Sequence, residues 1–214
     1  MGCKKVPKEK MRSAKFITLE GIDGAGKSTH INFIKQYLTQ NKIDFVVTRE
    51  PGGTELGEKL RELLLHDPMH AGTETLLMFA ARFEHLQKII MPSLNEGITV
   101  LCDRFSDATL AYQSAGKGVS EEFIKMLQKF THASVNPDLT FLFDLPTEVS
   151  LERLKKTRVL DKFEKEAQQF HDNVRQSYLS LAKLEPSRFH VIDSTQSIDT
   201  IQSILKNVLD KTIK

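Results

Sequence analysis

Short apolar runs alternate with longer segments of helical periodicity along most of the chain. The runs are continuous rather than alternating, which is typical of strands buried on both faces of a parallel sheet. Strands that alternate with helices predict an α/β fold in which helical crossovers join parallel strands. The predicted strands are residues 16–19, 45–47, 98–101, 139–143 and 189–192.

Apolar residues at helical spacing predict the helices between these strands. The predicted helices are residues 29–40, 54–65, 74–90, 121–130, a helix opening at Pro146 with Thr147 as its N-cap, 163–184 and 197–209. Pro92 is expected to interrupt the helix at 74–90 near its end, because proline lacks a backbone N–H. Residues 158–163 are interpreted as a charged break between helices.

The length of 214 residues suits one α/β domain rather than two. We therefore expect a single domain over residues 15–214, a three-layer fold with a five-stranded parallel sheet and helices on both faces. Residues 1–14 are basic and polar and lack the apolar core of a signal peptide, so they are predicted to form a flexible tail.

Composition narrows the possible partners. The formal net charge is only +2, so nothing in it calls for nucleic acid or a membrane surface as a partner. The sequence contains no run of about 18 apolar residues, so no transmembrane helix is predicted. The two cysteines, Cys3 and Cys102, have neither metal-ligand spacing nor a plausible disulfide partner, which fits a reducing cytoplasm.

A phosphate-binding loop follows the first predicted strand. The complete pattern G-x-x-x-x-G-K-[ST] is formed by Gly21, Ile22, Asp23, Gly24, Ala25, Gly26, Lys27 and Ser28. It lies between a strand and a helix, as the motif requires. Backbone N–H groups of such a loop converge on phosphate oxygens at the positive end of the helix. Lys27 is expected to reach the β- and γ-phosphates, and the Ser28 hydroxyl to bind Mg²⁺.

Asp23 is unusual inside this loop, because a carboxylate repels phosphate. We expect its side chain to point elsewhere, and a sugar hydroxyl is a natural partner. The alternative is a solvated position of the motif that tolerates many residue types.

Ligands of parallel sheets bind beyond the carboxyl ends of the strands. Arg49 follows the second strand, in a turn made rigid by Pro51 and two glycines. Its planar guanidinium suits a phosphate, although a surface ion pair with Glu50 or Glu55 is the alternative.

Asp103 and Arg104 follow the third predicted strand. An acid directly after a buried strand, in a protein with a phosphate loop, is the usual position of the carboxylate that holds Mg²⁺ or its waters. Arg104 beside it can neutralise a second phosphate. The alternative is a simple ion pair between neighbours, but the strand end favours a ligand-binding role.

Together these segments resemble the thymidylate kinase family. The resemblance runs from about Phe16 to the C-terminus and is carried by residues 21–29, 48–54, 79–82, 103–105 and 110–113. The phosphate loop alone is shared by many families, whereas the Arg-Glu-Pro-Gly-Gly-Thr turn and the Asp-Arg-Phe…Ala-Tyr-Gln stretch are more specific. The resemblance implies transfer of a phosphoryl group from Mg·ATP to dTMP by a cytoplasmic homodimer.

It also implies roles for individual residues. Residues from Gly21 to Thr29 would bind ATP, with Ser28 and Asp103 at the metal. Asp23 would bind the 3′-hydroxyl of dTMP, and Arg49 and Arg104 its phosphate. Around the nucleoside the implied contacts are Arg82, Thr109 and Gln113 at the base, and Tyr112 against the sugar, where a ribose 2′-hydroxyl would clash.

The base-stacking phenylalanine of the family lies four residues before the arginine that reads the base. Here that position is Met78, and Phe79 is one residue later. One residue turns a helix by about 100°. Either Met78 covers the thymine, or the helix is locally adjusted so that Phe79 does.

The stretch that begins at Arg153 resembles the mobile lid of the family, placed at about residues 153–165. Family members without an arginine in the phosphate loop carry the catalytic arginine on the lid, which makes Arg158 the candidate here. Arg153 would lie nearer the adenine, beside residues 194–196. The lid pattern of the family usually has Asp-Arg, whereas this chain has Asp161-Lys162.

The residues leave three alternatives open. A kinase for dUMP, dCMP or a deoxynucleoside is the nearest, although a nucleoside acceptor would want a carboxylate base near its 5′-hydroxyl. A GTPase-type switch is suggested by the N-K-x-D pattern of residues 41–44, which lies too early in the chain and is interpreted as a polar turn. A domain that binds nucleotide without catalysis is the third.

Overall fold

The structure, a computed structural model, describes residues 14–132, 135–155 and 161–213. Residues 1–13 of the predicted tail and the predicted catalytic residue Arg158 lie outside these ranges.

The described chain forms one five-stranded parallel sheet in the order β2-β3-β1-β4-β5. The fold class predicted from the sequence is confirmed. Leu19 pairs with Asp103 across β1 and β3, and Arg49 pairs with Asp103 across β2 and β3, so these strands end side by side. The strands are β1 (Phe16–Glu20), β2 (Phe45–Arg49), β3 (Thr99–Asp103), β4 (Leu139–Asp144) and β5 (Phe189–Asp193).

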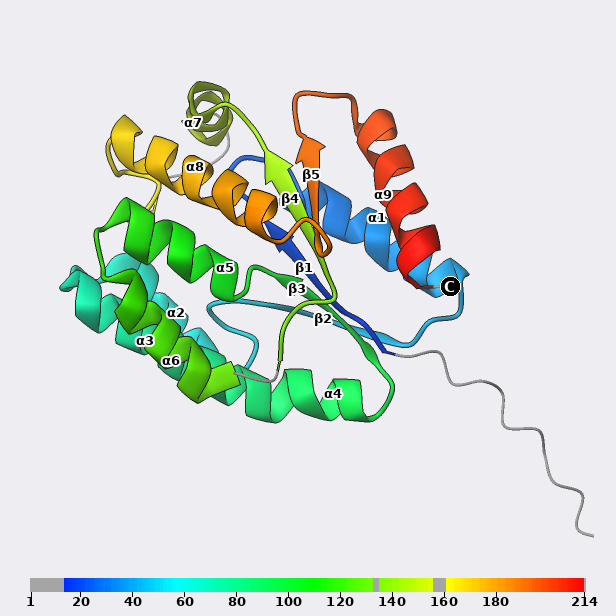
Figure 1. Cartoon of the computed structure of the whole chain (residues 1–214), viewed down its shortest axis with the longest axis horizontal. Helices are drawn as coiled ribbons and strands as arrows, with labels where there is room; N and C mark the ends of the chain where they lie inside the picture. The colour runs from blue at the N-terminus through cyan, green and yellow to red at the C-terminus, as the bar shows by residue number, and fades with distance from the viewer. Residues whose placement is uncertain (1–13, 133–134, 156–160, 214) are drawn as a thin grey trace, which may run out of the picture.

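Helices cover both faces of the sheet, and Figure 1 shows α1 and α9 on one side, with α8, α5, α3 and α6 on the other. The α-helices are α1 (Lys27–Gln40), α2 (Glu55–His66), α3 (Ala71–His85), α4 (Met91–Asn95), α5 (Ser106–Thr109), α6 (Glu121–His132), α7 (Thr147–Lys155), α8 (Gln168–Leu184) and α9 (Ile198–Thr212). Two π-helical segments continue α3 and α5, namely η1 (Leu86–Ile90) and η2 (Leu110–Gly116).

The main hydrophobic core lies between the sheet and these helices. Every residue of β1 is buried, as expected for a strand covered on both faces of a parallel sheet. The larger core cluster joins β1 and β4 to α1, α8 and α9, through side chains such as Leu19, Phe143, Ile34, Val174 and Leu205. A rigid core at this place fixes the ends of β1, β3 and β4, where the site lies.

The helix predicted over residues 74–90 is longer and less regular than expected. It begins at Ala71, becomes π-helical over Leu86–Ile90 and continues as α4 through Pro92. Pro92 therefore does not interrupt it. The proline lies in the first turn of α4, directly after the π-helical turns, where wider hydrogen-bond spacing accommodates the missing N–H.

Two further helix boundaries differ from prediction. α8 begins at Gln168 rather than at residue 163, because the Asp161 side chain accepts hydrogen bonds from the backbone of Phe163 and Glu164 and holds a separate turn. Thr147 is the first residue of α7 rather than its cap, and its hydroxyl donates to Asp172. The helical run from Ser106 to Gly116 was not predicted.

Residues 41–44 form the turn between α1 and β2, as the polar-turn interpretation predicted, and Asn41 donates to the Tyr37 carbonyl oxygen. This turn precedes β2 at the end of the sheet opposite the phosphate loop. Within the described ranges, no helix is long and apolar enough to span a lipid bilayer.

Candidate active site

The phosphate loop connects the buried strand β1 to α1, as its motif predicted. Gly21 has a φ of 129°, and a Cβ there would lie 2.4 Å from the Phe143 carbonyl oxygen on β4. Only glycine therefore lets the loop leave the sheet so close to β4. Gly26 caps α1 with a φ of 91°, and a Cβ there would lie in open space. The N-terminus of a helix offers free N–H groups to phosphate oxygens.

Lys27 lies in this cradle, where its Nζ donates to the carbonyl oxygens of Gly21 and Ile22 at 2.9 Å and 3.0 Å. Burial and the nearby Arg104 lower the pKa of Lys27, while Asp23 and Asp103 counteract this. Ser28 and Thr29 are exposed in the first turn of α1.

A metal site of the predicted kind fits these residues. The Oδ1 atom of Asp103 is buried and has no hydrogen-bond partner among the described residues. An orphaned carboxylate oxygen suits Mg²⁺, which typically takes one or two protein oxygens together with phosphates and water. The described residues contain no cluster of three or more His, Cys, Asp or Glu side chains, which this mode of binding does not need.

Arg104 lies at the centre of a polar cluster beside the loop. Its φ is 69°, and its guanidinium donates to Asp23 Oδ1 at 3.0 Å, Tyr112 Oη at 2.9 Å and Tyr178 Oη at 3.1 Å. It also stacks on the Tyr112 ring. Tyr112 donates to the second oxygen of Asp23 at 3.1 Å. The structure thus brings Asp23, Arg104 and Tyr112 together from three separate segments of the sequence.

The charge state of Asp23 follows from this cluster. Burial by itself raises its pKa, but the charges of Arg104 and Lys27 and two hydrogen bonds hold the pKa of Asp23 well below its usual range. Asp23 is therefore a carboxylate that turns away from the cradle toward Arg104.

Glu20, the last residue of β1, was not predicted from the sequence. Its Oε1 accepts the Phe105 N–H at 2.7 Å, and its Oε2 accepts the Tyr178 hydroxyl at 2.8 Å. Burial and the nearby Asp107 raise the pKa of Glu20 to about 8. Glu20 thereby holds the Tyr178 hydroxyl, which also accepts a hydrogen bond from Arg104.

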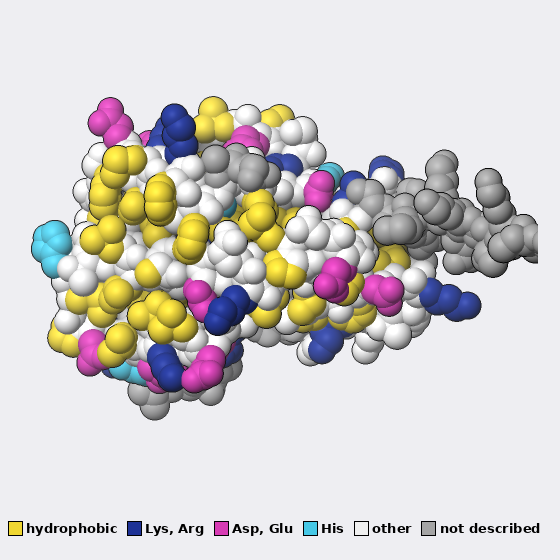
Figure 2. Space-filling model, turned by 90° about the horizontal axis from the view of Figure 1, so that it is seen from below, with side chains coloured by type: hydrophobic (Ala, Val, Ile, Leu, Met, Phe, Trp, Pro, Cys, Tyr) yellow, Lys and Arg dark blue, Asp and Glu magenta, His cyan; other side chains and the backbone are white. Residues whose placement is uncertain are grey.

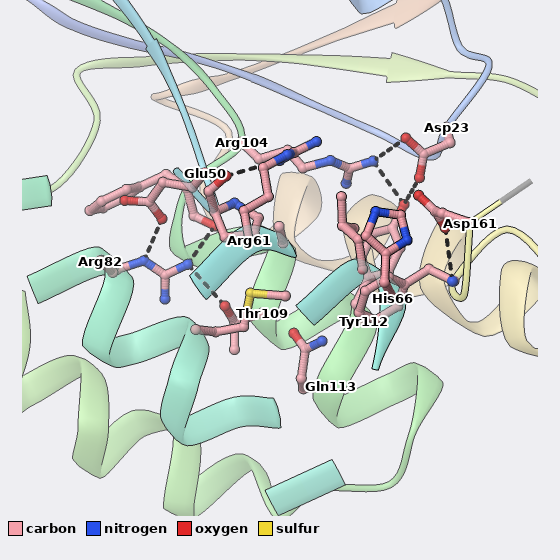
Figure 3. Close-up of a pocket in the computed structure, with 16 residues that line it drawn as sticks. Asp23, Glu50, Arg61, His66, Arg82, Arg104, Thr109, Tyr112, Gln113 and Asp161 are labelled. Carbon is pink, nitrogen blue, oxygen red and sulfur yellow. Dashed lines mark hydrogen bonds and ion pairs between the residues drawn. The ribbon is translucent and has the colours of Figure 1, made fainter. Parts of the chain in front are cut away.

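A cavity of about 280 Å³ opens next to this cluster (Figure 3). Arg82 lies at one end of it and Asp23 at the other. Predicted site residues on its wall are Asp23, Arg82, Arg104, Thr109, Tyr112 and Gln113. Residues from the lid segment and from α2 complete the wall, namely Asp161, Phe163, Arg61, Leu65 and His66.

Arg82 is fixed by buried partners. Its Nε donates to Glu50 Oε2 at 2.7 Å, and its Nη2 donates to the Phe105 carbonyl oxygen and to Thr109 Oγ1. Glu50 also hydrogen-bonds His85 Nδ1 at 2.9 Å. The Nη1 atom of Arg82 is buried without a partner among the described residues. A buried donor left unpaired is costly, so this atom calls for a partner that the described residues do not supply.

Between the two candidates for covering a base, the structure puts Met78 on the cavity wall. Phe79 is only 3% exposed and packs instead on the His132 ring and under the Arg82 guanidinium. The expectation that Phe79 contacts the substrate is therefore corrected, because the regular geometry of α3 turns it away from the cavity.

Arg49 does not line the cavity. Its half-exposed guanidinium pairs with Glu58 at 2.6 Å, a partner that differs from the Glu50 or Glu55 considered from the sequence. Arg61 of α2 lies on the wall instead and donates to the Pro51 carbonyl oxygen. Burial and the charge of Arg49 lower the pKa of Arg61. Nothing in the local sequence of α2 distinguishes Arg61 from a surface arginine.

The described part of the lid segment lies over the loop and the cavity. Arg153 donates to the carbonyl oxygens of Gly24 and Ser194, which join the loop to the end of β5. Lys162 pairs with Glu74 at 2.9 Å and donates to the Asp67 carbonyl oxygen.

This arrangement, in which a phosphate loop and an arginine-lined cavity share one edge of a parallel sheet, is that of the P-loop kinases. A family model described as thymidylate kinase matches residues 19–204. Thymidylate kinase of Janthinobacterium sp. (strain Marseille) is 52% identical over 93% of this chain and 98% of that protein. Thymidylate kinase of Methylobacillus flagellatus is 52% identical over 92% of this chain and 95% of its own length.

A solved structure agrees with these relatives. The crystal structure of thymidylate kinase from Ehrlichia chaffeensis has a TM-score of 0.75 and 34% sequence identity, over 92% of this chain and 99% of that one. The chain belongs to the thymidylate kinase family, and it is an enzyme, a nucleoside monophosphate kinase. The resemblance seen in the sequence motifs is confirmed.

Proposed function

We propose that the chain transfers the γ-phosphoryl group of Mg·ATP to dTMP, giving dTDP and ADP for dTTP synthesis. Phosphorylation of dTMP to dTDP is the reaction of its family. The observation that carries the proposal is the cavity beside the phosphate loop, with a buried, unpartnered Arg82 donor at one end and the Asp23–Arg104–Tyr112 cluster at the other.

The Arg82 end of the cavity binds the thymine base. The Arg82 guanidinium donates to the O4 acceptor of thymine, with Gln113 and Thr109 beside it. Met78 covers one face of the ring. The Glu50 carboxylate keeps Arg82 in place. Because the Arg82 side chain is already ordered, little conformational entropy is lost when the base binds.

The Asp23 end binds the deoxyribose. An ionised carboxylate with lone pairs left over from Arg104 and Tyr112 accepts a hydrogen bond from the 3′-hydroxyl. The Tyr112 ring lies against the sugar, where a 2′-hydroxyl has no room. This orientation directs the 5′-phosphate toward Arg104 and the phosphate loop.

The phosphates meet between these cations. Arg104 and Arg61 bind the dTMP phosphate with Arg49 near the entrance, while Lys27 and the loop N–H groups bind ATP. Ser28 and Asp103 would hold Mg²⁺, which would neutralise charge on the donor phosphates. The acceptor phosphate is already an anion, so no side chain has to act as a strong base.

Arg158 supplies the catalytic cation of the lid. It lies outside the described residues, and its role is what the resemblance to the family implies. The other two candidates have partners of their own. Arg153 is bonded to two carbonyl oxygens, and Lys162 is bonded to Glu74. Lid closure also excludes water and limits ATP hydrolysis.

A coupled ADP-release assay over dTMP, dUMP, dCMP, dAMP and dGMP tests the proposal. We expect dTMP to give the highest kcat/KM. Measurable activity with dUMP is also expected, because a methyl pocket contributes only about 1–3 kcal/mol of discrimination. ADP release that does not depend on any nucleoside monophosphate would contradict the proposal.

The same enzyme acts as a homodimer, with α3 and α6 as the interface. Exposed apolar side chains on these helices are Leu76, Phe83, Met126 and Phe130. The rings of Phe83 and Phe130 stack with centroids 6.2 Å apart. Figure 2 views the molecule from the side of α3, α6 and α4, and hydrophobic side chains gather on that face. Exposed apolar patches of this kind mark interaction sites.

Light scattering on a size-exclusion column tests the dimer. Phe130→Glu is expected to give a monomer, since Phe130 is 79% exposed at the patch. The matched control is Leu184→Glu, a residue 77% exposed at the end of α8, which should leave the dimer intact. A monomeric wild type at micromolar concentration would contradict the interface.

A cytoplasmic location belongs to the same proposal. It suits the free, buried thiol of Cys102.

A further inference from the structure

One fully buried carboxylate, Glu74 in the first turn of α3, lies behind the cavity and belongs to none of the roles assigned above. Its side chain has no exposed surface. Three side chains donate to it: Gln113 Nε2 at 3.1 Å to Oε1, and Lys117 Nζ at 3.0 Å and Lys162 Nζ at 2.9 Å to Oε2. Gln113 lies in η2, Lys117 directly follows η2, and Lys162 lies in the turn before α8.

The contact with Gln113 fixes the orientation of the Gln113 amide. A carboxylate only accepts hydrogen bonds, so the amide nitrogen has to face Glu74. The amide oxygen then faces the cavity, and Figure 3 shows it on the side of Thr109 and Arg82. A flipped amide would set two acceptor oxygens against each other. Among the described residues, no donor reaches the Gln113 Oε1 atom.

The cavity wall therefore carries a fixed pair of groups, the Arg82 guanidinium as a donor and the Gln113 Oε1 atom as an acceptor. Thymine and uracil offer the complement, a carbonyl oxygen next to a ring N–H. Cytosine offers the reverse, an amino group next to an unprotonated ring nitrogen, and would leave both protein groups unsatisfied.

The two lysines explain how a carboxylate is maintained at this depth. Burying an unpaired charge is very unfavourable, and two ammonium groups compensate it. Lys162 lies between Asp161 and Phe163, which both line the cavity. The Phe163 ring lies 4.5 Å from Lys117 Nζ and 5.2 Å from Lys162 Nζ. The carboxylate that holds Gln113 thus also anchors the segment that covers the base.

We infer that Glu74 is a positioning residue that sets base specificity: it holds the Gln113 amide with its oxygen toward the cavity and fastens the covering segment through Lys162. The site is thereby restricted to pyrimidines that carry an N–H beside a carbonyl. The inference rests on the proposed function and adds a residue that touches no substrate.

The test compares kcat/KM for dTMP, dUMP and dCMP in wild type and Glu74→Gln. A glutamine at position 74 can present either an oxygen or an amide nitrogen, so both orientations of Gln113 become accessible. We expect the dTMP:dCMP ratio to fall about tenfold or more. The dTMP:dUMP ratio should stay within about twofold, because uracil and thymine share the same edge. A purely structural role would lower all three values together and overturn the inference.

Glu166→Gln is the matched control, since Glu166 lies 3.6 Å from the same Lys117 Nζ but makes no contact with Gln113. Its dTMP:dCMP ratio should equal that of wild type. In the Gln113→Leu background, Glu74→Gln should not lower the ratio further, because the effect acts through the amide. A further fall of tenfold in that background would overturn the inference.

Thermal melting shows whether Glu74→Gln is folded. If it is not, Glu74→Asp takes its place, because aspartate keeps the charge for both lysines but withdraws it from Gln113. The dTMP:dCMP ratio should again fall, and an unchanged ratio overturns the inference. Wild-type enzyme that does not prefer dTMP over dCMP would contradict the proposed function itself, whereas a wild-type preference retained in the Glu74 variants contradicts only the role of Glu74.

Discussion

The phosphate loop and the acceptor cavity are organised in different ways, although they share one edge of the sheet. The loop is shaped by its backbone: Gly21 and Gly26 set its path, and Ser28 and Thr29 remain exposed. The cavity is shaped by buried side chains paired across the fold, such as Glu50 with Arg82. In the proposed function the loop is a general phosphate cradle, whereas the cavity is preorganised for the base of the acceptor.

Removing Arg158, the proposed catalytic cation of the lid, should lower activity more than any other change. Arg158→Ala is expected to lower kcat about 10³-fold or more, the scale of arginine fingers, because charge on the transferring phosphoryl group loses its partner. KM for dTMP should change little. Single-turnover kinetics measure the chemical step directly. A loss of less than about tenfold would shift the role to Arg153 or Lys162.

Breaking the buried pair should affect the acceptor side through stability. Glu50→Ala leaves the Arg82 guanidinium buried without its carboxylate, and we expect unfolding in urea to lose about 3–5 kcal/mol. Glu58→Ala is the matched control, because it removes an exposed pair with Arg49 and should cost about 1 kcal/mol or less. Equal losses in the two variants would show that Glu50 is no more important than a surface acid.

Asp23 separates the two halves of the site most sharply, since it belongs to the loop but faces the cavity. Asp23→Ala should raise KM for dTMP about 10- to 100-fold, the value of charged hydrogen bonds, while KM for ATP stays nearly constant. Steady-state kinetics with each nucleotide varied in turn provide the measurement. Equal losses for both nucleotides would place Asp23 at the donor phosphates.

The smallest effect concerns pH. The folded-state pKa of Glu20 is raised to about 8, above its ordinary value near 4.5, mainly by burial. Its contribution to stability is therefore fully present below pH 4.5 and is lost as pH rises through 8. We expect the Tm of wild type to fall about 2–4 °C more than that of Glu20→Gln between pH 7 and 8. Parallel melting curves across this range would contradict the raised pKa.

The same contrast explains what the sequence could predict. A glycine pattern followed by Lys27 and Ser28 is a local signal, and Asp103 and Arg104 stand out because they follow a buried strand. Glu20 and Tyr178 form a hydrogen bond although they lie 158 residues apart in the sequence, and Glu74 and Gln113 lie 39 residues apart. No local sequence pattern predicts such contacts. The choice between Met78 and Phe79 required the phase of α3, which a rotation of about 100° per residue decides.

Some helix boundaries could not be predicted for a related reason. A proline normally ends a helix, but the π-helical turns before Pro92 change the hydrogen-bond spacing, so the missing N–H of Pro92 does not end this one. A turn at Asp161 replaces the first turn of the helix predicted over residues 163–184. The Asp161 side chain accepts hydrogen bonds from the backbone N–H groups of Phe163 and Glu164.

The central claim is that cations from separate strand ends serve one cleft that holds two nucleotides end to end. Calorimetric titration with adenosine and thymidine joined 5′ to 5′ by a polyphosphate tests it most directly. Because both ends bind in one event, we predict a Kd at least about 100-fold below that of ATP or dTMP alone, and loss of this gain in Arg104→Ala. Binding no tighter than that of dTMP alone would contradict a shared cleft.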